Sequence, residues 1–139
     1  DEPMGWGDVD KLHSSGVTIG SHCHDHFILH SNQSGKNVNR QLKISKNIIE
    51  KRYGDCSYFC YPNGTFNDIS HKSYNLVKEI YSLGFTTCPG EVSSTTDKHL
   101  LSRLHIPKDL DYLKFKMNTS SFGNIIYKKN YNIFFKNVV

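Results

Sequence analysis

The feature that most limits the fold of this chain is an alternation of helical and strand-like segments. Three segments have apolar side chains at the spacing of amphipathic helices, and each is followed directly by glycine: 8–15, 38–53 and 69–83. Short apolar or β-branched runs predict four strands: 17–20, 57–61, 85–88 and 101–106. Helices that link successive strands favour parallel pairing, so we predict an α/β fold with a parallel sheet.

Two polar segments directly follow or end predicted strands. The segment SHCHDH, residues 21–26, comes after the first predicted strand, and YPNG, residues 61–64, ends the second. In parallel α/β proteins, sites gather at the carboxyl ends of the strands, because those ends lie along one edge of the sheet. We therefore expect these two segments to lie close together.

Composition excludes several other classes of protein. The 139 residues are 37% hydrophobic and 22% charged, which fits one globular domain over residues 1–139 with its own core. No apolar run approaches the roughly 18 residues of a membrane span, and the first residues lack the pattern of a signal peptide. The sequence therefore leaves the compartment open between cytoplasm and cell envelope. The net charge of +4 comes from scattered lysines, so we expect no nucleic-acid partner.

Three histidines within five positions make the segment 21–26 a candidate metal site. On a strand, His22, His24 and His26 would share one face, whereas on a helical turn His22 and His26 would converge and His24 would point away. Either arrangement could hold zinc or another divalent metal, because neutral imidazole is a common ligand of such ions. The alternative is an exposed turn capped by Ser21 and Asp25.

The segment GVTIGSHCHDHFIL, residues 16–29, resembles a motif of the polysaccharide deacetylases, the chitin-deacetylase and NodB-like family. In that motif a strand ends in Gly-Ser-His, and a second histidine follows four positions later. His22 and His26 fall on the two histidines that bind the metal, and Cys23 stands where the family usually has Ser or Thr.

The resemblance continues on both sides of this motif, in the family's order. Trp6, Leu12 and Gly16 resemble the helix that precedes it. Further similar segments are SKNIIEKRYG (45–54), YFCYPNGTFND (58–68), LGFTTCPGEV (83–92) and LLSRLHIP (100–107). The similarity spans about residues 4–110, and the ordered series carries it rather than any single motif.

The resemblance implies a distorted (β/α) barrel, incomplete at its N-terminus in this chain. It also implies a hydrolase that removes N- or O-acetyl groups from the sugars of a polysaccharide or oligosaccharide. The implied cofactor is zinc, or another divalent metal, held by His22, His26 and an aspartate.

The family's P-x-G turn implies roles for residues 61–64. The backbone N–H of Asn63 would help to bind the tetrahedral oxyanion. Pro62 and Gly64 would shape the turn on the substrate side, and Tyr61 would line the groove.

The sequence departs from the family most clearly in its first motif. That motif is a strand ending in T-F-D-D that supplies a metal ligand and the general base, and it is absent here. Only 21 residues precede His22, and the acidic ones lie in a predicted loop and helix: Asp1, Glu2, Asp8 and Asp10. We therefore expect the chain to be the C-terminal part of a deacetylase domain, inactive if the aspartates are lacking. An unpaired sheet edge would also favour a homo-oligomer.

Two further departures concern charged catalytic groups. Many family members have an arginine at the position of Cys60, and Arg103 is our candidate to supply that charge from a neighbouring strand. His105 is our candidate for the acid that protonates the leaving group. The alternative for His105 is an outward-facing strand residue.

Two other functions stay open. The domain could be a non-catalytic or vestigial carbohydrate-binding module, with aromatic residues near the turn stacking on sugars. The letters HCHDH also resemble the H-x-H-x-D-H signature of metallo-β-lactamase-like hydrolases, although they are one residue short. That second function would require His24.

Overall fold

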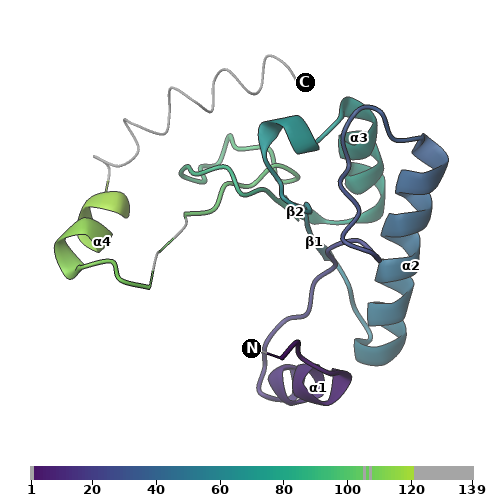
Figure 1. The fold of residues 1–139 in the computed structure, drawn as a ribbon, viewed down its shortest axis with the longest axis horizontal. Helices are drawn as coiled ribbons and strands as arrows, with labels where there is room; N and C mark the ends of the chain where they lie inside the picture. The colour runs from purple at the N-terminus through teal and green to yellow at the C-terminus, as the bar shows by residue number, and fades with distance from the viewer. Residues whose placement is uncertain (1, 105, 107, 121–139) are drawn as a thin grey trace.

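The computed structural model describes residues 2–104, 106 and 108–120. Its elements, in chain order, are α1 (Trp6–Ser14), α2 (Gly35–Tyr53), β1 (Tyr58–Cys60), the 3-10 helix η1 (Phe66–Asp68), α3 (His71–Ile80), β2 (Leu83–Phe85) and α4 (Tyr112–Asn118). Helices α2 and α3 pack side by side on one side of the two strands, and α1 lies close to the N-terminus (Figure 1).

The two strands form a parallel pair at the centre of the fold. Phe59 of β1 lies opposite Gly84 of β2. Single parallel bridges extend this pair on both sides, from Ser21 to Phe59 and from Phe85 to Leu101. The predicted parallel α/β arrangement is therefore confirmed. Within the described ranges the sheet has two strands and does not close into a barrel.

Three of the four predicted strands are wrong in extent. The predicted strand 85–88 shares only Phe85 with β2, which begins two residues earlier. Residues 17–20 are not a strand, and the pairing there is the bridge at Ser21, whose N–H donates to the Tyr58 carbonyl at 2.8 Å. In the parallel register set by Ser21 and Phe59, residues 17–20 would have to pair with 55–58, but 55–57 belong to the connection between α2 and the three-residue strand β1. In the described part of the predicted strand 101–106, residues 101–104 and 106, the pairing is the bridge at Leu101, because β2 ends at its partner Phe85.

Gly84 was predicted to stop the third helix, and this was wrong. Helix α3 ends at Ile80, and Gly84 is the middle residue of β2. A Cβ on Gly84 would lie 2.9 Å from the carbonyl carbon of His99 and closer still to its oxygen. Glycine is therefore required here because a neighbouring backbone approaches β2 closely.

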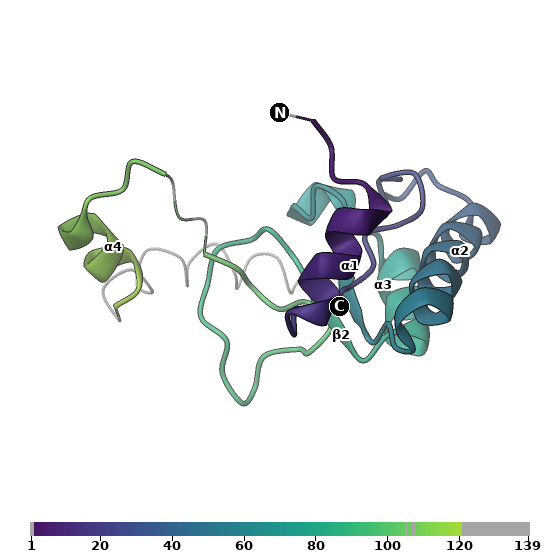
Figure 2. The same ribbon diagram turned by 90° about the horizontal axis from the view of Figure 1, so that it is seen from below.

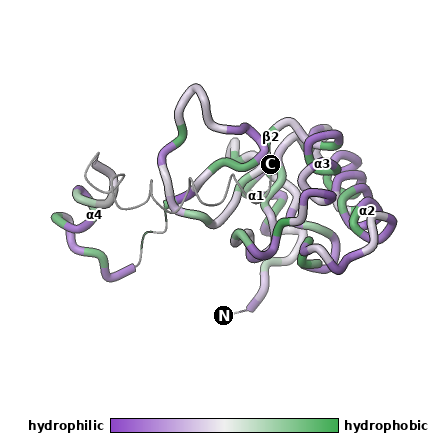
Figure 3. The backbone as a smooth tube through the Cα atoms, turned by 90° about the horizontal axis from the view of Figure 1, so that it is seen from above, coloured by the Kyte–Doolittle hydropathy of each residue, from purple (hydrophilic) through white to green (hydrophobic). Residues whose placement is uncertain are grey.

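Helix α2 follows the sequence prediction closely. The Ser34 side chain caps its first turn by accepting from the Asn37 N–H, and Gly54 ends it with a left-handed φ of 84°. Hydrophobic and hydrophilic residues recur along α2 and α3 with the turns of each helix (Figure 3). The apolar face of α2 contributes Val38, Leu42 and Ile49 to the core.

Helix α4 lies apart from the other helices in two perpendicular views (Figures 1 and 2). Its apolar side chains are largely exposed, with Tyr112 and Leu113 both at 72%. In the part of the chain that the structure covers, no helix has the length and apolarity needed to cross a membrane.

An ion pair joins α1 to the end of α2. Arg52 donates from Nε and Nη2 to the two carboxylate oxygens of Asp10 at 2.7 and 2.6 Å, and the Tyr53 hydroxyl donates to Oδ1 at 2.9 Å. These hydrogen bonds from Arg52 and Tyr53 lower the pKa of Asp10 to about 2. The ionised carboxylate therefore favours the docked position of α1.

The acid stability of the protein should depend on Asp10. Because the pKa of Asp10 is lowered in the folded state, its contribution is present above its ordinary pKa of 3.8 and is lost as the pH falls through about 2. In urea unfolding, Asp10→Asn should be less stable than the wild type at pH 6, with the difference shrinking toward pH 2. Parallel stability curves for the two proteins over this range would contradict the assignment.

Candidate metal centre

The two predicted site segments meet at the carboxyl end of β1. The backbone of Ser21 pairs with β1, which places His22 beside the end of that strand. The Nδ1 atom of His22 lies 2.8 Å from the carbonyl oxygen of Cys60. The expectation that residues 21–26 and the end of the second predicted strand lie close together is thus confirmed.

His22 and His26 face each other across a tight loop. Their ring centroids are 4.9 Å apart with an interplanar angle of 74°, and both residues are exposed. His24 is turned elsewhere, with Nε2 3.6 Å from Asp25 Oδ1. This is the pairing expected of a helical turn, but the loop achieves it with left-handed φ values of 64° at Cys23 and 51° at His26. Each such residue costs on the order of 1 kcal/mol.

The hydrogen bond of His22 fixes which ring nitrogen can bind a metal. A carbonyl oxygen can only accept, so Nδ1 of His22 carries the proton and donates to Cys60. The lone pair of Nε2 then remains for a ligand, which is the usual arrangement of a metal-binding histidine. Two exposed imidazoles, one of them oriented in this way, fit a divalent ion as half of a tetrahedral set.

The turn at 61–64 is held by the loop that follows β2. Asn63 is exposed with a φ of 56°, and its carbonyl accepts from the Thr87 hydroxyl at 2.6 Å. Gly64 has a φ of 67°, and a Cβ on it would lie 2.9 Å from the Tyr61 oxygen and 3.0 Å from the Thr87 nitrogen. The turn is therefore closely packed on its inner side and open at Asn63.

A family model of the polysaccharide deacetylases matches residues 3–81, which is more than half of the 139 residues. The chain belongs to the polysaccharide deacetylase family. The match covers both the histidine segment and the P-x-G turn of this deacetylase-family chain, and it confirms the resemblance drawn from the motifs. No curated protein and no solved structure shows significant similarity to it.

The predicted substrate-contacting side chains of this deacetylase domain are not exposed. Tyr61 and Pro62 are both less than 2% exposed, and the Tyr61 hydroxyl donates to the carbonyl of His99 at 3.1 Å. The Tyr61 ring lies in the core, and its burial raises the pKa of the hydroxyl. The side chains of Tyr61 and Pro62 therefore pack on the inner side of the turn. Because they are buried, the structure does not support the predicted contact with substrate in a groove.

Arg103 lies near the position where many deacetylases have an arginine. Its Nε donates to the carbonyl of Thr86 at 2.7 Å. Burial raises the pKa of the Cys60 thiol, and the positive charge of Arg103 opposes that rise. Arg103 is thus close enough to act on the Cys60 position from the neighbouring segment. The candidate acid His105 lies outside the described residues.

The thiols beside the deacetylase histidines are protonated at neutral pH. Burial raises the pKa of Cys23 to about 12, and the charge of Asp25 adds to the rise. Since the thiolate is the form that binds metals, Cys23 is a poor ligand. In the described ranges, no three His, Cys, Asp or Glu side chains form a group that could hold a metal ion. In the part of the deacetylase domain that the structure covers, the candidate metal centre therefore consists of two histidines.

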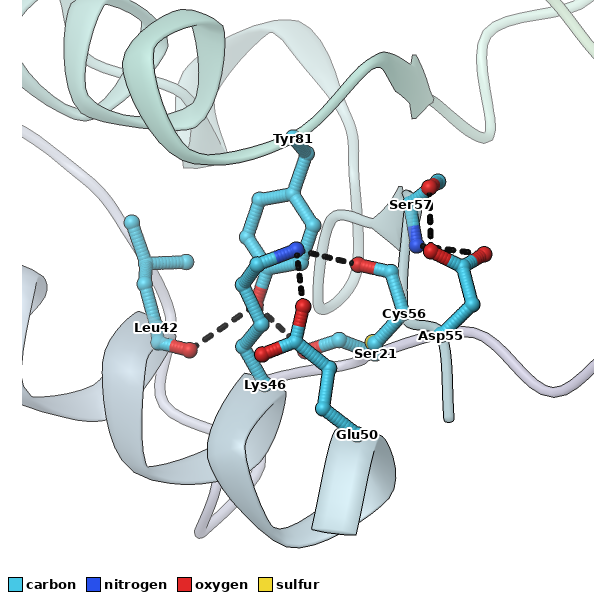
Figure 4. Close-up of polar contacts among 8 residues, drawn as sticks. All are labelled: Ser21, Leu42, Lys46, Glu50, Asp55, Cys56, Ser57 and Tyr81. Atoms are coloured by element: carbon cyan, nitrogen blue, oxygen red, sulfur yellow. Dashed lines mark hydrogen bonds and ion pairs between the residues drawn. The ribbon is translucent and has the colours of Figure 1, made fainter. Parts of the chain in front are cut away.

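A buried polar network supports the first histidine, and the sequence analysis missed it. The Tyr81 hydroxyl lies 2.8 Å from both Ser21 Oγ and the Leu42 carbonyl oxygen, and Ser45 Oγ lies 2.8 Å from Ser21 Oγ (Figure 4 shows the Tyr81 contacts). Beside it, Lys46 donates to the Cys56 carbonyl at 2.7 Å. Polar residues at core-facing positions of an amphipathic helix, such as Ser45, were the signal that could have found this network.

Proposed function

We propose that this chain is part of a metal-dependent hydrolase that removes acetyl groups from N-acetylated or O-acetylated sugars of a polysaccharide. His22 and His26 act as metal ligands in this proposal, and the complete fold is the distorted (β/α) barrel of the family. The observation that carries it is the convergence of the two imidazoles at the carboxyl end of β1, with Nε2 of His22 free.

The proposed chemistry needs both a metal and the adjacent turn. A bound zinc ion would supply Lewis acidity toward the acetyl carbonyl and toward a water molecule. Asn63 is exposed at the turn, and in this proposal its backbone N–H would stabilise the oxyanion. Arg103 would add positive charge, and His105 would protonate the departing group.

The rival hydrolase is disfavoured by the direction of His24. A metallo-β-lactamase-like site would need His24 with His22 or His26, but the His24 ring is directed at Asp25, with Nε2 3.6 Å from Oδ1. A non-catalytic carbohydrate-binding module remains the second candidate function. The absence of a third ligand beside the two histidines in residues 2–104, 106 and 108–120 favours it over an active site in this chain alone.

Zinc content and acetate release test the proposed function together. The purified chain should hold about one zinc ion per molecule by elemental analysis, lose it to a chelator, and recover it on addition of zinc. An N-acetylglucosamine oligomer and an O-acetylated oligosaccharide are the substrates for the acetate assay. Zinc with acetate release supports the enzyme, zinc without release supports the binding module, and no zinc at any concentration overturns the metal site.

A further inference from the structure

Gln41 is a buried polar residue of α2 whose side chain, among the described residues, bonds to the loop between the two histidines. It is 7% exposed and lies on the core-facing side of the helix. Its Oε1 accepts from the backbone N–H groups of His24 and Asp25 at 3.1 and 3.0 Å. Its Nε2 donates to Asp25 Oδ2 at 2.8 Å. These three partners fix the orientation of the amide, because the two N–H groups require an oxygen and the carboxylate requires a donor.

The loop held by Gln41 is one that the backbone would not adopt unaided. Cys23 and His26 have left-handed φ values, on either side of the two residues that Gln41 binds. A positive φ is uncommon for any residue but glycine, and cysteine, unlike histidine, is not enriched there, so surrounding contacts must hold the loop. Without Gln41, two backbone N–H groups would lose their partner, and the loop could relax toward extended conformations. The His22 and His26 rings would then separate.

Helix α2 holds this segment at two points, one helical turn apart. Gln41 binds residues 24 and 25, and Ser45 contacts Ser21 Oγ at 2.8 Å. Residues four apart lie on the same helix face, so one rigid face of α2 sets both the start of the loop and its middle. Among the described residues, the Gln41 side chain bonds to residues 24 and 25 and to neither the His22 nor the His26 ring, so it acts through the loop.

We propose that Gln41 is a positioning residue that preorganises His22 and His26 for a shared divalent ion. This inference rests on the proposed metal site and adds to it the residue that sets its geometry. Loss of an outer partner of a metal ligand typically costs roughly 10–100-fold in affinity. The same range is expected for Gln41→Leu, which keeps the size of the side chain and removes all three hydrogen bonds.

Two measurements on the full chain test the proposal. The first is the dissociation constant for Co²⁺ and Zn²⁺, and the second is the nuclear Overhauser effect between the His22 and His26 rings without metal. Gln41→Leu should weaken the binding of both metals by roughly 10–100-fold and abolish the inter-ring signal. Tyr74→Phe is the matched control, because it removes one partly buried hydrogen bond, to Asp97, from the neighbouring helix α3. It should leave both readouts unchanged.

A rescue experiment separates positioning from general stability. Gln41→Glu places a second carboxylate against Asp25 and should weaken binding as much as Gln41→Leu does. Adding Asp25→Asn gives the new carboxylate at position 41 an amide donor at position 25. The metal affinity of the double variant should therefore return to within about threefold of the wild-type value, a difference of under 1 kcal/mol.

The outcomes distinguish this inference from the proposed function. Unchanged metal affinity and an unchanged inter-ring signal in Gln41→Leu would overturn the role of Gln41. If the wild type binds no metal, the metal site is overturned. If the inter-ring signal is then present in the wild type and lost in Gln41→Leu, the positioning role is upheld.

Discussion

Replacing either His22 or His26 by alanine should lower zinc affinity by roughly 100-fold or more, because even outer partners of a metal ligand are worth 10–100-fold. A large loss is expected because the two rings, 4.9 Å apart, are the only metal-binding side chains grouped there within the ranges described. Each replacement would leave a single imidazole. Isothermal titration or competition with a coloured chelator would measure the change, with zinc content as a check.

His24→Ala is the matched control for these two replacements. It removes an imidazole from the same loop, but that imidazole pairs with Asp25 and not with the other rings. Zinc affinity should change by less than about threefold, which is under 1 kcal/mol. A loss in His24→Ala as large as in His22→Ala would contradict the site and favour the metallo-β-lactamase-like alternative.

The sequence predicted the larger elements of this fold because local signals agreed with one another. Helix α2 has an apolar stripe and a terminal glycine, and both features are present in the structure, whereas its capping residue Ser34 was not predicted. The parallel pairing of β1 and β2 followed from the helix between them. The extent of the strands at residues 17–20 and 101–106 was not predictable, since it depends on how much neighbouring backbone is free to pair.

The approach of the two histidine rings was predictable from the sequence, but the backbone geometry of their loop was not. The spacing of His22 and His26 suggested that they could converge, as they do. The left-handed backbone at Cys23 has no local signal, because cysteine does not favour that conformation. Gln41 shows only as a polar residue on an apolar helix face, and its partners are more than fifteen positions away in the chain.

Gly84→Ala should destabilise the fold by about 3 kcal/mol, the upper end of what overpacking usually costs. The added Cβ would press on the His99 carbonyl group, which is backbone and cannot turn aside as a flexible side chain would. Gly84 also donates to the Lys98 carbonyl and accepts from the Leu101 N–H, so the segment 98–101 cannot move away without breaking these bonds. Urea unfolding monitored by circular dichroism would give the free energy of unfolding.

Gly7→Ala makes the same chemical change where there is open space, and it should raise the free energy of unfolding instead of lowering it. Gly7 lies within α1 with no atom within 4 Å of an added Cβ, so alanine should stabilise by roughly 0.5–1 kcal/mol through helix propensity. If Gly84→Ala proved as stable as the wild type, the close approach of residues 98–101 to β2 would be wrong. A shift of β2 would also affect the candidate site, because the carbonyl of Phe85 in β2 accepts from the Tyr61 N–H and so holds the turn that contains Asn63.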